Sequence, residues 1–462
     1  MKLISFLLHL RLVIIFVSAL VIFLTHYLIS GQAVYGDGIG YYAHLHSWYF
    51  DHNWDSTNEY QHIYTPENNN ALNPIQADHV QIISVSSRGR ANNQFSPGSA
   101  LFLLPFYVLA DLISLVLLQL GIVISRTGYS DLYQILTGIG VISWSVVAFY
   151  LTEKLLKILV KTNDQTIFPW VSLLMFFSTH LLFYMGFDVI KSHFASYLLS
   201  VVFFYLLFLE SGYQKWWHSL SLGLVSGLAT ITRPQDGLLT IIYLIWWLWF
   251  YQKINLRKLK SIKVWQLFLK EMSAFVSGFV IVVSIMVYQW STLYYSIFEH
   301  QNLQDIKLNL ARESFSFWGS LFHPQFGFIT QTPIVGMALV FIFIQLFRKK
   351  IDSRIWLMII FFILNFFVIT VHGGWAVAAF GGRMYSSSLV LIAWGLAEMF
   401  KTIKTNNRQA IIIFLFFFFT SLNLYNLSYF ILYGKNNEAG KKGTEERTIQ
   451  RIQKLKQKFK LE

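Results

Sequence analysis

The chain alternates between long apolar runs and short polar connections, and this pattern predicts an all-α polytopic membrane protein. Runs of about 20 apolar residues are long enough to cross the hydrocarbon core of a bilayer as helices. Such runs recur from the start of the chain to residue 433. Eleven crossings are predicted, near residues 3–29, 131–153, 167–187, 192–211, 219–233, 237–252, 271–295, 333–347, 355–371, 385–402 and 409–433.

One further apolar run, 97–124, is not counted as a crossing. If it crossed, every long basic loop after it would lie outside, against the positive-inside rule. Pro105 and Asp111 interrupt the run, so we interpret it as an interfacial or re-entrant helix pair. With this topology, 19 of the 27 lysines and arginines before residue 434 lie inside and eight outside.

This topology divides the chain into two parts. Residues 1–433 form the transmembrane domain, in which 31–130 is a large first extracytoplasmic loop with interfacial helices. The first run lacks a small-residue cleavage site, which favours an uncleaved anchor over a signal peptide. Residues 434–462 mix apolar residues with lysines and predict a basic amphipathic tail on an anionic membrane surface.

The amino-acid composition excludes several classes of protein and site. Hydrophobic residues make up 55% of the chain and charged residues 13%, too few charges to cover a soluble domain of this size. The absence of cysteine excludes disulfides and thiolate metal sites. The net charge of +13 does not indicate nucleic acid as a partner, because in a membrane protein the positions of the cations matter more than their sum. A bacterial plasma membrane suits the Phe-, Ile-, Lys- and Asn-rich composition.

The first outer loop opens with an aspartate between glycines, Gly36-Asp37-Gly38. Glycines let the backbone approach a ligand closely. A carboxylate at the membrane surface could deprotonate an acceptor hydroxyl as a general base, or bind a divalent cation. Tyr41 and Tyr42 follow as candidate substrate contacts. The alternative interpretation is a flexible helix cap.

The outer loops also contain candidate ligands for a phosphate, because guanidinium and ammonium groups bind phosphate oxygens. The alternatives are contacts with anionic lipids and ion pairs, such as Lys191 with Asp188 or Arg233 with Asp236. The candidates are Arg88, Arg90, Lys191, His193, Arg233 and Arg383.

Two other patterns concern sugar and metal binding. Gln325, His372 and Trp375 lie in glycine-rich loops, where a tryptophan could stack on a sugar. The first loop holds five histidines, but a pair such as His44-x-His46 fits a strand better than a helix as a ligand pair. We therefore do not expect these histidines to bind a metal. The five are His44, His46, His52, His62 and His79.

Taken in order, these clusters resemble the GT-C superfamily of integral membrane glycosyltransferases. More narrowly, they resemble bacterial relatives of the protein O-mannosyltransferases and of the aminoarabinose transferase that modifies lipid A. Many members have Asp-Glu in the first outer loop, whereas Gly38 follows Asp37 here, so a second acidic role is not carried over. The resemblance rests on Gly36-Asp37-Gly38, Phe95-Ser96-Pro97-Gly98, Ser192-His193, Gly227-Leu228-Ala229 with Arg233-Pro234, Gln325-Phe326-Gly327-Phe328 with Thr332-Pro333, and Gly373-Gly374-Trp375 with Phe380-Gly381-Gly382-Arg383.

The resemblance implies transfer of a sugar from a polyprenyl-phosphate-linked donor to an acceptor hydroxyl at the extracytoplasmic face, with inversion. Asp37 would be the general base, and the cationic residues would stabilise the leaving phosphate. Two alternatives remain: a flippase or transporter of lipid-linked sugars, and a surface-polysaccharide ligase or polymerase with a diphosphate-linked donor. The acceptor, whether protein, lipid or glycan, is not identified.

Overall fold

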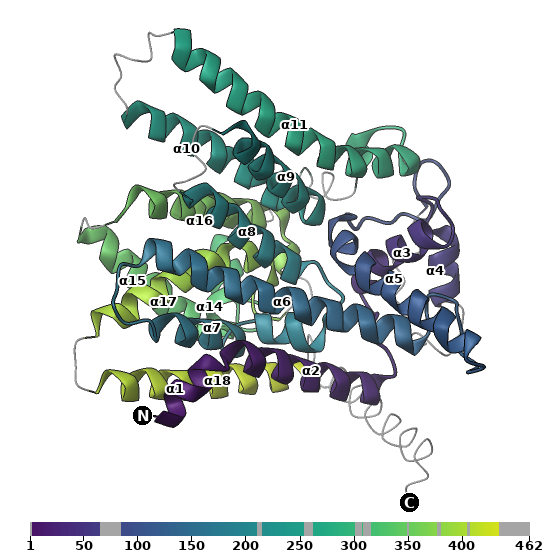
Figure 1. Cartoon of the computed structure of the whole chain (residues 1–462), viewed down its shortest axis with the longest axis horizontal. Helices are drawn as coiled ribbons and strands as arrows, with labels where there is room; N and C mark the ends of the chain where they lie inside the picture. The colour runs from purple at the N-terminus through teal and green to yellow at the C-terminus, as the bar shows by residue number, and fades with distance from the viewer. Residues whose placement is uncertain are drawn as a thin grey trace, which may run out of the picture.

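The computed structural model is a helical bundle with no β-strand among the residues it describes, which are 2–64, 85–209, 215–253, 262–300, 307, 316–348, 351–376, 380–403 and 407–433. Most helices lie side by side, and α3, α4 and α5 gather at one end (Figure 1). The helices are α1 (Lys2–His9), α2 (Arg11–Ser30), α3 (Gly38–Tyr49), α4 (Thr57–Tyr64), α5 (Gly98–Gln119), α6 (Asp131–Leu159), α7 (Ile167–Phe177), α8 (His193–Phe208), α9 (Trp216–Thr232), α10 (Leu239–Lys253), α11 (Ile262–Leu293), α13 (Phe317–Phe322), α14 (Phe328–Gln331), α15 (Pro333–Phe347), α16 (Ser353–His372), α17 (Leu389–Thr402) and α18 (Arg408–Tyr433).

Six of the described helices are long and apolar enough to cross a membrane: α2, α5, α6, the part of α11 from Trp265, α16 and α18 up to Ile431. The chain is therefore an all-α, multi-pass membrane protein. Helices α7, α8 and α15 are shorter apolar helices. Each of the eleven predicted crossings overlaps at least one helix, whereas the tail 434–462 lies outside the described residues.

The long helices expose apolar side chains, as a lipid environment requires. On α2, Val13, Val17 and Val21 are about half exposed, whereas Ala19 and Phe23 on the other face are buried. The phenylalanine tract of α18 is likewise exposed at Phe414, Phe417 and Phe418. In water these faces would be unfavourable, but in lipid they contact acyl chains.

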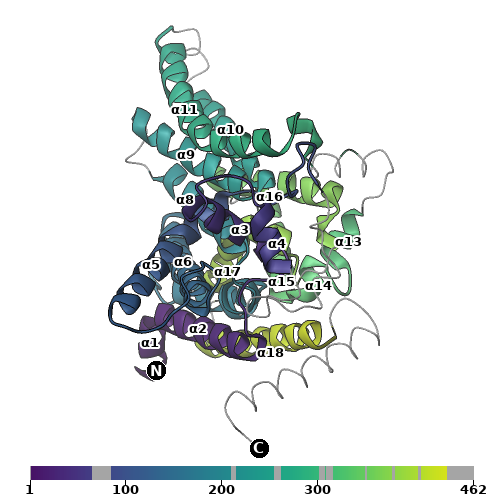
Figure 2. The ribbon, with the colours of Figure 1, turned by 90° about the vertical axis from the view of Figure 1, so that its right-hand side faces the viewer.

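Helices α2 and α6 are antiparallel neighbours held by polar contacts at both ends. The Tyr27 hydroxyl donates to Asp131 Oδ1 at 2.7 Å where α2 ends and α6 begins. At the opposite end, Arg11 Nη2 lies 2.6 Å from Glu153 Oε2. The chain between them, 31–130, thus leaves and re-enters the bundle at the same end. Figure 2 views this end, with α3 and α4 toward the viewer.

The apolar run expected to be a helix pair forms one continuous helix, α5. Pro105 lies inside it without ending it, as neighbouring helices often permit in membranes. Asp111 does not break it either, because its buried carboxylate accepts hydrogen bonds from Tyr49 (2.8 Å), Tyr133 (2.5 Å) and Arg126 (2.7 Å). These bonds join α3, α5 and α6.

Helix α5 runs beside only the first half of α6. Near its start, the Phe102 carbonyl accepts a hydrogen bond from Trp144 Nε1 at 2.9 Å, and farther on Asp111 meets Tyr133 in the first turn of α6. At 1.5 Å of rise per residue, Trp144 lies about 20 Å along α6 from its beginning. Helix α5 therefore starts deep in the bundle, and its direction leads out past the end at which α6 begins.

Candidate functional site

The site centres on Asp37, in the turn that joins α2 to α3. Its Oδ2 accepts a hydrogen bond from Arg383 Nη1 at 2.7 Å, across 346 residues of sequence. Arg383 follows Gly381 and Gly382, which both have positive φ angles of 66° and 65°. Glycine adopts this conformation without steric penalty. A Cβ at Gly382 would lie 2.7 Å from Phe328, so the turn also permits close packing against α14.

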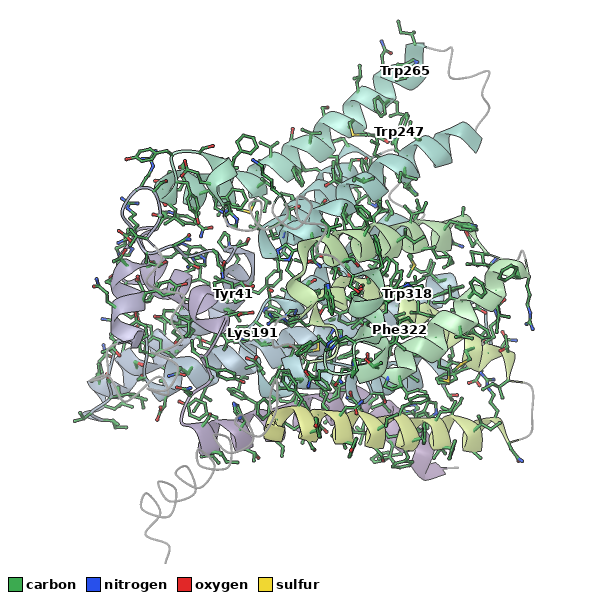
Figure 3. The ribbon with its side chains drawn as sticks, turned by 180° about the vertical axis from the view of Figure 1, so that it is seen from behind. Tyr41, Lys191, Trp247, Trp265, Trp318 and Phe322 are labelled. Atoms are coloured by element: carbon green, nitrogen blue, oxygen red, sulfur yellow. The ribbon has the colours of Figure 1, made fainter. Side chains whose placement is uncertain are left out.

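Lys191 approaches the same point from the connection that precedes α8. Its Nζ donates to the Tyr35 carbonyl at 2.9 Å and lies 3.5 Å from Asp188 Oδ2. Tyr41, in the first turn of α3, donates its hydroxyl hydrogen to Ser192 Oγ at 2.9 Å. Figure 3 shows Tyr41 and Lys191 near each other in the bundle. The two contacts fasten the start of α3 to the connection before α8.

Arg233, the residue after α9, is a third cation of the site. Its Nη1 donates to His193 Nδ1, and its Nη2 lies 2.6 Å from the Met384 sulfur. Because a guanidinium has no lone pair to accept a hydrogen bond, His193 Nδ1 is the unprotonated nitrogen. Arg233 is only 7% exposed, and His193 and Met384, the two groups that its guanidinium contacts here, are uncharged. A buried guanidinium with uncharged partners is well suited to bind an anion.

The electrostatics favour an ionised Asp37. Burial alone would raise the pKa of Asp37, but the charges of Arg383, Lys191 and Arg233, with the Arg383 hydrogen bond, outweigh it and lower the pKa to about 2. The side chain remains about one-third exposed at 35%. A carboxylate this strongly held is a weak base. Three neighbouring positive charges also disfavour a metal cation at Asp37.

Two buried carboxyl groups beside the cations show the opposite shift. Burial raises the pKa of Asp188 to about 6, the charge of Asp37 adds to this shift, and Lys191 opposes it. Burial likewise raises the pKa of Asp236 to about 6, against the charge of Arg233. Both Oδ1 atoms, and Nε of Arg383, have no hydrogen-bond partner within the described part of the chain. The centre thus has unused donors and acceptors that a ligand could satisfy.

The remaining predicted residues form separate groups. Tyr42 is 1% exposed and donates to the Gly128 carbonyl at 2.7 Å, which makes it a packing residue of the first loop. Trp375 packs closely against Gly319 on α13 and lies near the His323 ring, with centroids 6.0 Å apart. The backbone N–H of Gln325 donates to His323 Nδ1 at 3.2 Å.

His372 ends α16, and its Nδ1 accepts from the backbone N–H of Gly374 at 3.2 Å. It therefore shapes the turn that leads into Trp375. The contacts of Gln325, His372 and Trp375 link α13, the 323–326 turn and the end of α16.

Arg88 and Arg90 contact the end of α11. Arg88 Nε donates to the Tyr294 carbonyl at 3.1 Å, and Arg90 Nη1 donates to the Thr292 carbonyl at 3.2 Å. The last carbonyls of a helix lack partners within it and attract cations. Arg90 also lies 3.4 Å from Asp55. These contacts hold the first loop against α11.

Sequence reasoning missed several residues that support the Arg383 turn. Gln235 donates to the Met384 carbonyl at 2.7 Å and to Asn365 Oδ1 at 3.2 Å. Asn365 in turn donates to Ser387 and Ser388 at 2.9 and 3.0 Å. A buried asparagine in the apolar run of α16 is the signal that could have found this network, because such a side chain needs partners in lipid. Met384 carries no such signal.

Comparisons with known proteins leave the family of this chain undefined. No family model matches the sequence, and a search of curated proteins finds no match.

Proposed function

We propose that the protein is a membrane glycosyltransferase that transfers a sugar from a polyprenyl-phosphate-linked donor to an acceptor hydroxyl. The observation that carries this proposal is the meeting of Asp37 with Arg383, Lys191 and Arg233, which come from four separate connections. A reaction that expels a phosphate needs cations for the leaving group and a base for the acceptor. The Asp37 centre has both kinds of residue.

The proposal includes a GT-C-like fold with eleven crossings and a site on the extracytoplasmic face of a bacterial inner membrane. Two observations support it. The segment 31–130 begins and ends at one end of the α2–α6 pair, as a single outer loop would. The depth at which α5 starts, beside Trp144, would bring the outer loop into the outer leaflet, where a lipid-linked phosphate lies.

In the proposed reaction the acceptor oxygen attacks the anomeric carbon from the face opposite the phosphate. The new C–O bond forms as the bond between the anomeric carbon and the phosphate oxygen breaks, and that electron pair stays on the phosphate. Asp37 takes the hydroxyl proton. Arg383, Arg233 and Lys191 stabilise the additional negative charge on polyprenyl phosphate, so no acid is needed for the leaving group.

The Asp37–Arg383 ion pair has a consequence for this reaction. While Arg383 donates to Asp37, the pKa of Asp37 is about 2 and the carboxylate is a poor base. A donor phosphate would compete for the guanidinium and shift part of its charge away from Asp37. The pKa of Asp37 would then rise, so that donor binding would activate the base.

The remaining residues take supporting roles in the proposal. His193 orients Arg233 through its hydrogen bond, and Tyr41 holds α3 in place through Ser192. Gln325, His372 and Trp375 would line a more distant part of the acceptor or sugar path. Arg88 and Arg90 are not assigned to the phosphate, because their donors already serve the end of α11.

The test is turnover of a panel of polyprenyl-phosphate sugars by the purified protein in detergent. We expect release of polyprenyl phosphate by the wild type and a loss of at least 100-fold in Asp37→Asn, in line with removal of a general base. The matched control is Asp352→Asn. Asp352 caps α16 and forms a solvent-exposed ion pair with Arg354, and Asn can accept the same capping hydrogen bond. Full turnover by Asp37→Asn would refute the assigned base. Movement of lipid-linked sugar between liposome leaflets, with no turnover of any donor, would indicate a transporter instead.

A further inference from the structure

A second group of ionisable side chains lies in the first loop, away from the Asp37–Arg383 pair. It consists of His46 on α3, Asp51 in the following turn and Glu59 on α4. One ligand atom from each side chain lies within 4.8 Å of the other two. Figure 2 shows α3 and α4 side by side at the end of the bundle that faces the viewer.

Two of the three separations between these atoms match those of ligands around one metal ion. His46 Nδ1 lies 3.1 Å from Glu59 Oε1 and 3.3 Å from Asp51 Oδ2. Ligands bound at about 2.1 Å with angles of 90° to 109° stand about 3.0 to 3.4 Å apart. Both separations fall within this range, and the two carboxylate oxygens lie within 4.8 Å of each other, so a small adjustment of the side chains would place all three around one ion.

The charge balance of the group also calls for a cation. Glu59 is fully buried, and its Oε2 has no hydrogen-bond partner among the residues that the structure describes. In the same part of the chain, the only ion pairs of Asp51 and Glu59 are with His46, and no lysine or arginine joins them. With both carboxyl groups ionised beside one imidazole, the group carries a net negative charge, which a bound cation would offset.

The surroundings hold the three side chains in place. The His46 ring stacks with the rings of Phe50 and Tyr129, with centroids 5.1 and 4.5 Å away. Asn58 Nδ2 donates to Asp51 Oδ2 at 2.7 Å, a contact of the kind that orients a metal-binding carboxylate. The Asp51 side chain is 26% exposed, so an ion can reach the group from solvent on that side.

We infer that His46, Asp51 and Glu59 bind a divalent first-row transition metal, such as Zn²⁺ or Mn²⁺, that links α3 to α4. One imidazole nitrogen with two carboxylates suits these ions better than Mg²⁺ or Ca²⁺, which prefer oxygen ligands alone. Water would complete the coordination on the Asp51 side. Because Asp37 immediately precedes α3, the ion would stabilise the helix that positions the candidate base.

This site differs from the histidine pairs considered from the sequence. His44 Nε2 instead contacts the Phe95 carbonyl at 3.0 Å, so the His44-x-His46 pair does not act as a unit. The ligands combine one histidine with two carboxylates from a later turn and helix. The inference does not depend on the proposed transferase reaction, since metal content and thermal stability can be measured without a substrate.

The test uses full-length protein in detergent, purified without chelators and with an affinity tag that contains no histidine. The protein is incubated with Zn²⁺ or Mn²⁺ and then desalted. We expect mass spectrometry to find about one equivalent of the added ion per chain. The ion should raise the thermal unfolding midpoint of chelator-treated protein, whereas Mg²⁺ should not. Fewer than 0.1 equivalents (roughly one chain in ten), with no thermal shift from Zn²⁺ or Mn²⁺, would overturn the assignment. An equal response to Mg²⁺ would also overturn it, because it would exclude the imidazole ligand.

Isosteric variants locate the ion. Asp51→Asn and Glu59→Gln should each lower metal affinity at least 10-fold and abolish the thermal shift, because each removes a ligand charge. The matched control is His52→Asn, in the same loop. His52 has a φ of 53°, which asparagine tolerates, and it is exposed. Asp51→Asn is the more informative variant if Glu59→Gln does not fold, since Asp51 is partly exposed. Unchanged metal content in a folded Asp51→Asn protein would refute the ligand set.

Discussion

Substitution of Gly38 by alanine tests whether the position of α3 controls the candidate site. A Cβ at Gly38 would lie 2.6 Å from the Ile190 carbonyl oxygen, a backbone atom next to Lys191. Ordinary contacts of this kind begin at about 3.2 to 3.4 Å, so the start of α3 must move by roughly 0.6 to 0.8 Å. Overpacking of this size typically reduces the free energy of unfolding by about 1 to 3 kcal/mol.

The displacement acts directly on Asp37, the residue before Gly38. Misplacement of a catalytic group by about 1 Å can reduce the rate on the order of 100-fold. We therefore expect Gly38→Ala to lower turnover of a polyprenyl-phosphate sugar by about 10- to 100-fold, with a lower thermal unfolding midpoint. Both quantities are measured on the same detergent-purified protein.

Gly31→Ala is the matched control in the same connection. Gly31 ends α2 with a φ of 73°, and a Cβ there would meet nothing within 4 Å. Alanine would cost about 1 kcal/mol of backbone strain there without displacing α3. We expect a lower midpoint with turnover close to wild type. If Gly38→Ala matched the wild type in both assays, or if Gly31→Ala lost as much turnover, the reasoning from α3 position would be wrong.

Two further predictions concern ionisable groups. The pKa of Asp37 is lowered from 3.8 to about 2. The ion pair of Asp37 should therefore stabilise the fold above pH 3.8, and this stabilisation should be lost as the pH falls toward 2. Because the side chain is partly exposed, solvent screening limits the effect to on the order of 1 kcal/mol. Asp188 and Asp236 have raised pKa values, so their protonation changes stability in the opposite sense. The measurement is therefore the difference in acid unfolding between the wild type and Asp37→Asn. Identical unfolding curves would contradict the predicted role of Asp37. Glu153→Gln should reduce the free energy of unfolding by about 3 kcal/mol, because it leaves Arg11 without its charged partner. The double variant Arg11→Met, Glu153→Met should recover most of this loss in thermal unfolding. If it does not, the loss in Glu153→Gln is not caused by the unpaired charge of Arg11.

The predicted crossing 167–187 illustrates what a hydropathy pattern cannot resolve. The structure ends α7 at Phe177 and resumes with a π-helical turn at Phe183–Phe187. Asn423 of α18 donates to the carbonyls of Phe177 and Thr179 at 2.9 and 3.1 Å. A helix break inside a membrane is stable only when other groups satisfy the freed backbone. That partner is 244 to 246 residues away in the sequence, so the break was not predictable from the run itself.

In the candidate site, too, the sequence predicted several of the residues, whereas the packing of the helices decided which of them meet. The glycines around Asp37 and the Arg-Pro turn at Arg233 marked polar loops at the ends of apolar runs, and most of the cations predicted in such loops do meet at Asp37. The sequence could not distinguish Arg383, which pairs with Asp37, from Arg88 and Arg90, which contact the end of α11. All are arginines beside apolar segments. Which acceptor each arginine meets, a carboxylate or a helix-end carbonyl, depends on how the helices pack.

The sequence by itself determined the class of protein and the approximate places of its helices, because lipid solvation acts on each apolar run of sufficient length separately. The tertiary structure decided the depth at which α5 begins, the pairing of Asp37 with Arg383, and the meeting of His46, Asp51 and Glu59. These depend on distances between segments far apart in the chain or separated by a turn. Periodicity and composition describe local preference, whereas a site is a set of contacts that only the packing of whole helices brings about.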